Sequence, residues 1–327
     1  MIALLRCVTS AIVATAWIVN SSSGARADIR FATGVDATFL TMVVAVEKGF
    51  MQKHGVKAEY KQFASGAVSL EAVVSGDADV AFASELAVLR PLSKGGKIVG
   101  LARGLYANDL MGIAARKGID GPKDLAGKAI GYAKGTASEY YLSLYTNKYN
   151  IDVKSLRLVN VAAPEMVPAL ARGDIDVMFA WEPWFTRLRA VVPDARVIAK
   201  SGDDGVYTLQ YIVMASETAL RTKRDEVANT VRALIEATNW LNDASNRSES
   251  ADILSRAYRV PRPDAERQLG EVVYVFDLAA SFKDDIRKAA DWMKTQGLIQ
   301  AESTEKLVND LLAPDILKSV APDRVKS

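Results

Sequence analysis

Residues 72–85 read AVVSGDADVAFASE, and residues 169–182 read ALARGDIDVMFAWE. The two stretches align without a gap at an offset of 97 residues, and eight of their fourteen positions are identical. A single stretch of this kind is common in α/β proteins, where a glycine-aspartate helix end often precedes an apolar strand. A gapless match of this density favours an internal repeat instead, and two copies are too few for a solenoid. The chain is therefore predicted to contain two similar α/β lobes.

Each copy of the repeat predicts a helix followed by a buried strand. The helix ends at Gly76 in the first copy and at Gly173 in the second, where a left-handed cap favours glycine. The strands that follow, Val80–Phe82 and Val177–Phe179, are apolar enough for both faces to be buried. Ligands of open α/β sheets bind beyond the carboxyl ends of the strands, so the residues after each strand are expected to face a cleft.

The remaining segments alternate in the same way and predict how the chain is divided. Helices are expected at 38–53 and 138–149 and over most of the chain from 216 to 317, and strands at 29–33, 56–62, 98–105, 110–115, 129–132, 156–160, 196–198 and 207–215. This order predicts an α/β protein of two lobes, with residues 28–107 and 206–327 forming a discontinuous first lobe and 108–205 the second. Two chain crossings make a hinge, and the lobes are expected to close around a ligand between them.

Residues 1–27 have the layout of a secretory signal peptide. An apolar run over residues 8–19 follows Arg6, and residues 25–27 (Ala-Arg-Ala) supply the small side chains of a cleavage point. The run is too short to span a membrane, although an uncleaved membrane anchor is the alternative. Cys7 lies before the run rather than at the cleavage point, so no lipid anchor is expected. These features predict an exported protein.

The composition argues against several function classes. Without residues 1–27 the chain has 39 basic and 39 acidic residues and no cysteine. The balanced charge does not indicate nucleic-acid binding. Without cysteine, no disulfide is expected. His54, the only histidine, lies at the end of a predicted helix, where it complements the helix dipole. We find no metal-ligand cluster, P-loop, dinucleotide fingerprint or Ser-His pair. No catalytic residue, metal or cofactor is therefore expected, and an enzyme would have to work with carboxylates alone.

Two predicted helix starts suit an anion. Gly135-Thr136-Ala137-Ser138 stands between a strand and a helix, where unpaired N–H groups and the positive end of the dipole are exposed. Ser65-Gly66 has the corresponding position in the first lobe. Simple N-capping by Thr136 or Ser138, without a ligand, is the alternative. If both starts face one cleft, they predict an anion site.

Two further segments should reach the cleft. In Trp181-Glu182-Pro183-Trp184, Trp181 is suited to form the wall of a pocket. Glu182 is suited either to pair with a cationic group of a ligand or to cap the next helix, and its repeat partner Glu85 favours the structural role. Gly34 to Ala37 follow the first predicted strand, and Asp36 there is also suited to be an N-cap.

Three separate motifs, in order along the chain, resemble those of one protein family. Residues 118–131 (GIDGPKDLAGKAIG), followed by Gly135-Thr136, resemble the "Asp-Leu-x-Gly-Lys, then Gly-Thr" signature of ABC-transporter solute-binding proteins. Residues 173–183 resemble the "Gly-x-x-Asp-Ala … Trp-acid-Pro" stretch of the nitrate/sulfonate/taurine group, which includes thiamine-pyrimidine binders. Residues 47–56 resemble the "Gly-x-Phe, then Gly-Leu" opening of that group.

The resemblance implies a type II periplasmic-binding-protein fold that closes on a small molecule and docks on the permease subunits of an ABC importer in the periplasm. It implies a monomer and ligand contacts at Gly34, Asp36, Ala37, Ser65, Gly66, Ser84, Gly135, Thr136, Ser138, Trp181 and Glu182. An alkanesulfonate or taurine is favoured, because Glu182 beside an anion site suits a zwitterion. Nitrate, an aromatic carboxylate, or an enzyme or sensor built on the same fold are the alternatives. The cysteine-rich motif of thiamine-pyrimidine relatives is absent after residue 27.

Overall fold

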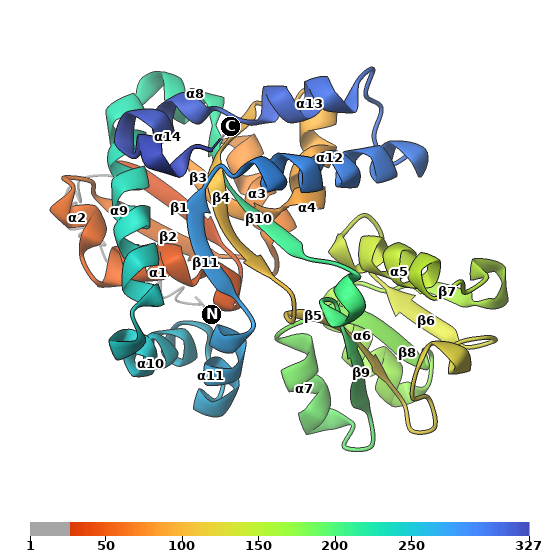
Figure 1. Cartoon of the computed structure of the whole chain (residues 1–327). Helices are drawn as coiled ribbons and strands as arrows, with labels where there is room; N and C mark the ends of the chain where they lie inside the picture. Colours follow the sequence, from red (N-terminus) through yellow and green to blue (C-terminus); the bar gives the residue numbers. More distant parts are fainter. Residues whose placement is uncertain (1–26, 327) are drawn as a thin grey trace, which may run out of the picture.

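The computed structural model describes residues 27–326, so the predicted signal peptide lies outside the described residues except for Ala27. The chain forms two α/β lobes, each built on its own sheet (Figure 1). The larger lobe has a six-stranded sheet of order β11-β4-β10-β3-β1-β2, and the smaller lobe has a five-stranded sheet of order β7-β6-β8-β5-β9. This is the two-lobed arrangement that the repeat and the resemblance predict.

The elements are assigned to the lobes by the sheet that they form or cover. The larger sheet comprises β1 (Ile29–Thr33), β2 (Ala58–Gln62), β3 (Val80–Ser84), β4 (Ile98–Ala107), β10 (Leu209–Ser216) and β11 (Val273–Asp277). Its helices are α1 (Leu40–Glu47), α2 (Phe50–Lys53), α3 (Gly66–Ser75), α4 (Glu85–Ser93), α8 (Glu217–Thr222), α9 (Arg224–Asn242), α10 (Arg247–Tyr258), α11 (Arg262–Gly270), α12 (Ala280–Thr295), α13 (Thr304–Leu311) and α14 (Pro314–Val320). The smaller lobe comprises β5 (Met111–Ala115), β6 (Ala129–Tyr132), β7 (Arg157–Asn160), β8 (Val177–Trp181), β9 (Arg196–Lys200), α5 (Ala137–Lys148), α6 (Ala163–Arg172) and α7 (Trp184–Val191).

The two sheets share one strand order. In the larger lobe β2, β1 and β3 are parallel and β10 runs antiparallel to β3, and in the smaller lobe β7, β6 and β8 are parallel and β5 runs antiparallel to β8. The antiparallel strand beside each parallel set is the one that follows a crossing from the other lobe. Each lobe therefore places the carboxyl ends of its three parallel strands at the same edge of its sheet.

The repeated residues do the same structural work in both lobes. Gly76 and Gly173 end α3 and α6 with φ angles of 85° and 83°, in the left-handed region that glycine occupies at little cost. The Asp79 N–H donates to the carbonyl of Arg30 (2.8 Å) and its Oδ2 accepts from the Arg30 N–H (2.9 Å). Asp176 makes the same two bonds with Ala129, at 2.8 and 2.9 Å. The repeat thus fixes each strand to its parallel neighbour.

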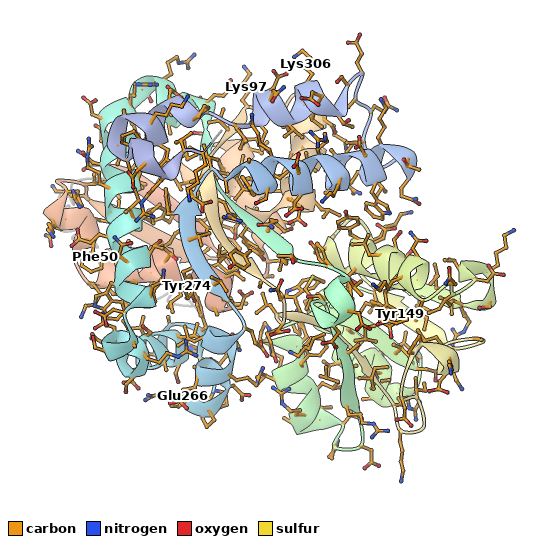
Figure 2. All side chains as sticks on the ribbon, in the orientation of Figure 1. Phe50, Lys97, Tyr149, Glu266, Tyr274 and Lys306 are labelled. Carbon is orange, nitrogen blue, oxygen red and sulfur yellow. The ribbon has the colours of Figure 1, made fainter. Side chains whose placement is uncertain are left out.

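The structure differs from the sequence prediction in three places. The sequence analysis expects no helix directly after the first repeat strand, where the structure has α4. The helix expected at 38–53 is divided into α1 and α2 at Gly49, whose φ of 75° stops the helix. The largely helical C-terminal part contains one strand, β11, which pairs antiparallel with β4 at the sheet edge. Tyr274 on this strand is buried, and its hydroxyl donates to the carbonyl of Ala37 (2.8 Å) (Figure 2). β11 is therefore held from both sides by contacts that are distant in sequence.

Two short segments connect the lobes. The chain passes from β4 to β5 through residues 108–110 and returns from β9 to β10 through residues 201–208. The Ser201 hydroxyl donates to the carbonyl of Asn108 (2.6 Å), and the Thr208 hydroxyl donates to its side-chain oxygen (2.8 Å). A Cβ at Gly202 would lie 2.7 Å from the Asn108 Cβ, so only glycine allows this approach. The two crossings are thus hydrogen-bonded to each other. The exact boundaries between the lobes, at 107/108 and 205/206, stay predictions.

Between residues 27 and 326, we find no helix with the length and apolar character that crossing a bilayer requires.

Candidate ligand-binding cleft

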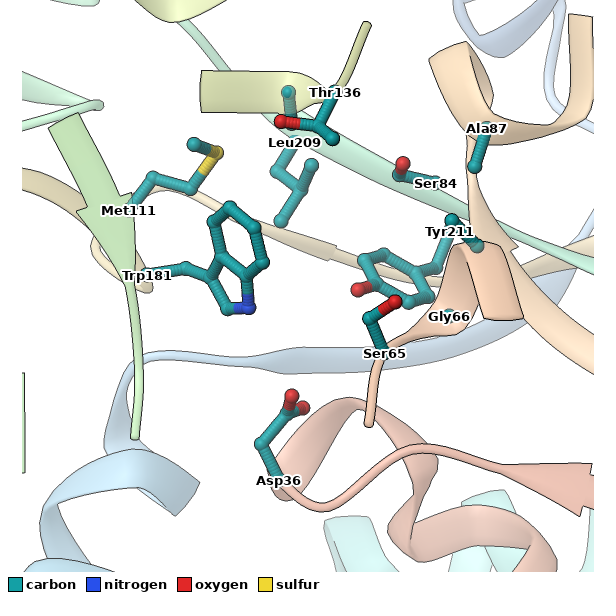
Figure 3. A pocket seen from close by; sticks show the side chains of 12 residues that line it. Asp36, Ser65, Gly66, Ser84, Ala87, Met111, Thr136, Trp181, Leu209 and Tyr211 are labelled. Atoms are coloured by element: carbon teal, nitrogen blue, oxygen red, sulfur yellow. The ribbon is translucent and has the colours of Figure 1, made fainter. Parts of the chain in front are cut away.

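A pocket lies between the lobes at the carboxyl ends of β1, β3 and β8 (Figure 3). It encloses about 510 Å³ of empty space, including the part that is open to solvent. Both lobes supply its lining, which consists of Asp36, Ser65, Gly66, Ala67, Ser84, Ala87, Met111, Thr136, Ala137, Trp181, Leu209 and Tyr211. The pocket therefore occupies the position expected for a ligand in open α/β sheets.

Three helix N-termini meet at this pocket. Ser65, Ser84 and Thr136 are the N-caps of α3, α4 and α5, and all three line the pocket. The Ser84 hydroxyl makes no capping hydrogen bond, and among residues 27–326 the N–H groups of Gly66 and Ala137 have no acceptor. First-turn N–H groups and the positive ends of helix dipoles together favour a negatively charged group.

The Thr136 hydroxyl is already used within the protein. It donates to the carbonyl of Ala133 (2.8 Å) and accepts from the Ser138 N–H (3.1 Å). Its proton is therefore not available to an anion, and the donors that α5 offers are backbone N–H groups. Glu139 in the first turn accepts from the Gly135 N–H (2.6 Å), which satisfies one further donor of this helix start.

Asp36 is the single carboxylic acid in the lining. Its Oδ1 accepts from the N–H (2.9 Å) and the hydroxyl (2.5 Å) of Thr38, so it caps the short helix that follows. The carboxylate points into the pocket (Figure 3), and its Oδ2 has no hydrogen-bond partner among residues 27–326. Burial raises the pKa of Asp36 to about 6, against the hydrogen bonds from Thr38 and with a smaller contribution from Glu182. Asp36 is thus both the N-cap and the pocket residue that the sequence analysis left as alternatives.

The rest of the wall is largely apolar. Trp181 and Met111 from the smaller lobe face Leu209 and Tyr211 of β10 across the pocket (Figure 3). The ring of Tyr211 packs edge-on against Phe39, with 5.7 Å between ring centroids, which fixes its orientation. A small molecule with a short apolar part would contact these four side chains.

Five predicted contacts do not line the pocket: Gly34, Ala37, Gly135, Ser138 and Glu182. Gly34 lies under the ring of Phe39, where an added Cβ would be 2.1 Å from the ring. The carbonyl of Ala37 accepts from Tyr274 of β11. Gly135 lies in a neighbouring cavity. The loops that carry these residues reach the cleft, but Gly34 and Ala37 face the protein interior and Gly135 faces the neighbouring cavity.

Ser138 has a structural role. It is completely buried, and its hydroxyl accepts from the Ala133 N–H (3.1 Å) and donates to the carbonyl of Phe179 (2.7 Å). Ser138→Ala is expected to lower the free energy of unfolding by about 1–3 kcal/mol, because two buried backbone groups lose their partner. Urea denaturation measures this change. Ser155→Ala is the control, since the exposed Ser155 hydroxyl bonds only the carbonyl of Asp152; equal stability of the two variants would contradict the prediction.

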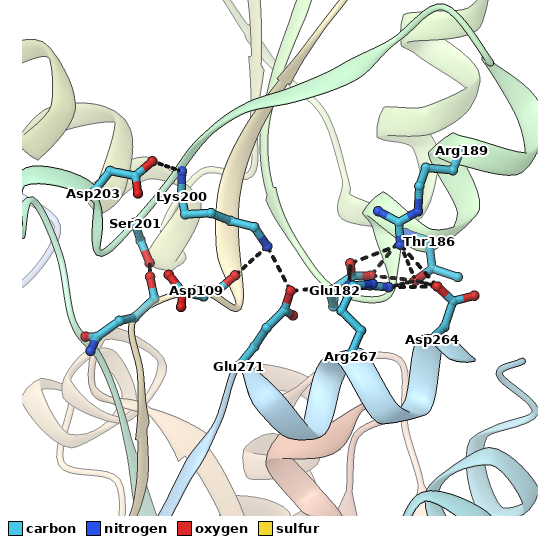
Figure 4. A network of polar contacts seen from close by, with 11 residues as sticks. Asp109, Glu182, Thr186, Arg189, Lys200, Ser201, Asp203, Asp264, Arg267 and Glu271 are labelled. Atoms are coloured by element: carbon cyan, nitrogen blue, oxygen red, sulfur yellow. Dashed lines mark hydrogen bonds and ion pairs between the residues drawn. The ribbon is translucent and has the colours of Figure 1, made fainter. Parts of the chain in front are cut away.

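Glu182 faces the other lobe instead of the pocket (Figure 4). Its side chain is fully buried, and Oε2 accepts from the N–H (3.0 Å) and the hydroxyl (2.8 Å) of Thr186 in the first turn of α7. Oε1 forms ion pairs with Arg267 of α11 (2.5 Å) and with Arg189 (3.4 Å). The expectation that Glu182 contacts the ligand is therefore not supported by this geometry, and the capping role is.

Two more ion pairs join the lobes beside Glu182 (Figure 4). Arg189 of α7 pairs with Asp264 of α11 (3.2 Å), and Lys200 of β9 pairs with Glu271 at the end of α11 (2.9 Å). Glu85, the repeat partner of Glu182, is also a buried acceptor, bonded by the Gln210 N–H (3.2 Å). Burial raises the pKa of Glu85 to about 7, against a hydrogen bond from Tyr207. Both repeated glutamates thus serve the structure rather than the pocket.

A sequence comparison with known families matches residues 36–246 to the family described as NMT1/THI5 like. The chain belongs to the NMT1/THI5-like family. The chain is 25% identical over 283 residues to the taurine-binding periplasmic protein of Escherichia coli (strain K12). This alignment covers 80% of this chain and 85% of that protein. It is also 25% identical over 228 residues to a relative from Brucella abortus (strain 2308), with 69% of each chain covered.

Solved structures share the two-lobed fold. The alkanesulfonate-binding protein SsuA from Xanthomonas axonopodis pv. citri, bound to MOPS, superposes with a TM-score of 0.72 at 18% identity, over 86% of this chain and 96% of that one. The periplasmic nitrate-binding protein NrtA from Synechocystis PCC 6803 superposes with a TM-score of 0.75 at 16% identity, over 90% of this chain and 88% of that one. Superposition at these TM-scores shows that the chain has the periplasmic-binding-protein fold.

Sequence reasoning missed six residues of the lining: Ala67, Ala87, Met111, Ala137, Leu209 and Tyr211. Ala67 and Ala137 are next to predicted helix starts, so local pattern could have included them. Met111, Leu209 and Tyr211 lie at the beginning of antiparallel strands. The rule that ligands bind at carboxyl ends of parallel strands does not point to them.

Proposed function

We propose that this chain is the periplasmic solute-binding component of an ABC importer and that it captures a small organic anion, with taurine or an alkanesulfonate favoured. The convergence of three helix N-termini on one pocket carries this proposal. The proposal retains the division made from the sequence, namely a signal peptide at 1–27, lobes at 28–107 with 206–327 and at 108–205, and a monomer that docks on permease subunits.

The chemistry of the pocket favours an organic ligand over a bare inorganic ion. A sulfonate would accept from the N–H groups at the starts of α3 and α5 and from the Ser84 hydroxyl. Its carbon chain would contact Trp181 and Leu209, and the ammonium of taurine would pair with Asp36. Asp36 thus takes the role that the sequence analysis considered for Glu182. Nitrate has neither an apolar part nor a cationic group, so it would leave Trp181 and Asp36 without a partner.

The relatives agree with this class of ligand. One relative is named as a taurine-binding periplasmic protein and one structural neighbour as an alkanesulfonate-binding protein. A nitrate-binding neighbour has the same fold, and so nitrate and an aromatic carboxylate remain the alternatives within the same transport role.

Thermal unfolding of purified residues 28–327 tests the ligand class. Taurine or ethanesulfonate is expected to raise the melting temperature, because a ligand that binds only the folded state at 100 times its Kd adds about 2.7 kcal/mol. Nitrate and benzoate at equal concentration and ionic strength are the comparison. Trp181→Ala should abolish the shift, while Trp240→Ala, on α9 of the larger lobe and outside the pocket lining, should retain it. No shift with any of the four compounds would contradict the proposed function.

A further inference from the structure

A second cavity adjoins the pocket beyond the helix starts. It shares Ala67, Ala87 and Thr136 with the pocket, so the two are continuous along one wall. It encloses about 1000 Å³ of empty space, including the part that is open to solvent. Its lining contains the cationic residues Arg90, Lys94 and Lys134 and one acidic residue, Glu71. The pocket contains a single acid and no cation, and the second cavity is basic.

Arg90 has no ion-pair partner within residues 27–326. It projects from α4 of the larger lobe, and its Nε is buried without any hydrogen-bond acceptor. By contrast, the half-buried Arg103 forms two hydrogen bonds to Asp277, at 2.9 and 2.8 Å. Because an unpaired guanidinium loses solvation on burial, such groups normally find an anion. Arg90 can therefore still bind an anionic group.

The guanidinium of Arg90 reaches the opposite lobe next to the start of α5. A Cβ placed on Gly135 would lie 2.5 Å from its Nη2, so the guanidinium packs directly on the backbone of Gly135. Gly135 has a φ of +74°, in the left-handed region, and precedes the pocket residue Thr136. Arg90 thus lies where the two cavities meet, with its planar face against one lobe and its stem on the other.

We infer that the second cavity is an anion subsite, in which Arg90 binds a carboxylate or sulfonate carried by the far end of the ligand. The inference rests on the proposed function, because the sulfonate of the same ligand is placed at the helix starts, which border both cavities. The second acidic group then extends away from Asp36 into the second cavity. A guanidinium forms two parallel hydrogen bonds with such a group, and Lys94 and Lys134, which are exposed, add long-range attraction. The preferred ligands are then organic dianions, with a sulfonate at one end and a second acidic group at the other.

A matched pair of ligands tests the inference. Sulfoacetate carries a second acidic group and ethanesulfonate does not, and their affinities are compared by isothermal titration calorimetry at one ionic strength. The protein is expected to bind sulfoacetate about 10- to 100-fold more tightly, as a charged hydrogen-bonded pair allows. Arg90→Gln should remove this preference by lowering the affinity for sulfoacetate much more than that for ethanesulfonate, and Arg90→Lys should retain part of it.

Two further variants make the outcome specific. Lys97→Gln removes an exposed charge just beyond α4 and outside both cavities (Figure 2) and should retain the preference. Gly135→Ala should reduce the preference without removing a charge, because the new Cβ displaces the guanidinium. Equal affinity of the wild type for the two ligands, or an equal loss of both in Arg90→Gln, would overturn the inference and leave the proposed function intact. Failure to bind either ligand would overturn both.

Discussion

Replacing Arg267 with alanine is expected to weaken ligand binding by roughly 10- to 100-fold while both lobes remain folded. Arg267 belongs to the larger lobe, and its guanidinium is paired with Glu182, which the smaller lobe holds fully buried. This ion pair and its neighbours form only when the lobes are together. Arg267→Ala therefore destabilises the closed state more than the open state, because its pairs with Asp264 and Glu271 lie within one lobe and are lost in both states. The apparent affinity falls with the population of the closed state.

The structure offers a matched control on the same helix. Arg262 of α11 pairs with Asp252 and Glu266 within the larger lobe only, so Arg262→Ala should retain the wild-type affinity. Arg267→Lys keeps the charge but loses the planar fork, and an intermediate affinity is expected. Calorimetry measures the affinities, and X-ray scattering of the ligand-free variants should show a larger radius of gyration for Arg267→Ala. Unchanged affinity and unchanged radius would contradict a role of these ion pairs in closure.

Acidification is expected to have opposite effects on the binding of taurine and of ethanesulfonate. Burial raises the pKa of Asp36 to about 6 in the ligand-free protein. The ammonium of taurine needs the ionised carboxylate, so its affinity should level off about one unit above this pKa and fall by up to tenfold per unit below pH 6. Ethanesulfonate is repelled by the ionised carboxylate, so its affinity should rise as the pH falls through 6.

Asp36→Asn separates these effects from general acid sensitivity. Asparagine keeps an oxygen that accepts from Thr38, so the helix cap is retained, but the charge is lost. Taurine should bind roughly 10- to 100-fold more weakly to this variant, ethanesulfonate more tightly, and both without the pH dependence around 6. Asp109→Asn, which removes an exposed acid next to the crossing but not in the pocket lining, is the control. A flat taurine affinity between pH 5 and 7.5 in the wild type would contradict the role of Asp36.

Much of the fold was predictable because its signals are local or repeated. Glycine is needed where a helix ends in a left-handed conformation, and an apolar strand follows directly, so Gly76 and Gly173 mark equivalent points of two lobes. The same locality explains why Ser65, Ser84 and Thr136 were placed at the cleft. β11 was missed although its valines and aromatic residues favour a strand, because it stands among helices and its pairing partner, β4, is more than 160 residues away.

The two lobes, their strand ends and the starts of α3 and α5 were predictable, because each depends on backbone conformation and on hydrophobic pattern over a few residues. Which acid enters the pocket depends instead on tertiary contacts. Asp36 and Glu182 both follow an apolar strand and precede a helix start, so local pattern does not distinguish them. Contact with α11 distinguishes the two acids. Arg267 of this helix lies 85 residues beyond Glu182 in sequence and pairs with it, whereas the second oxygen of Asp36 faces the pocket.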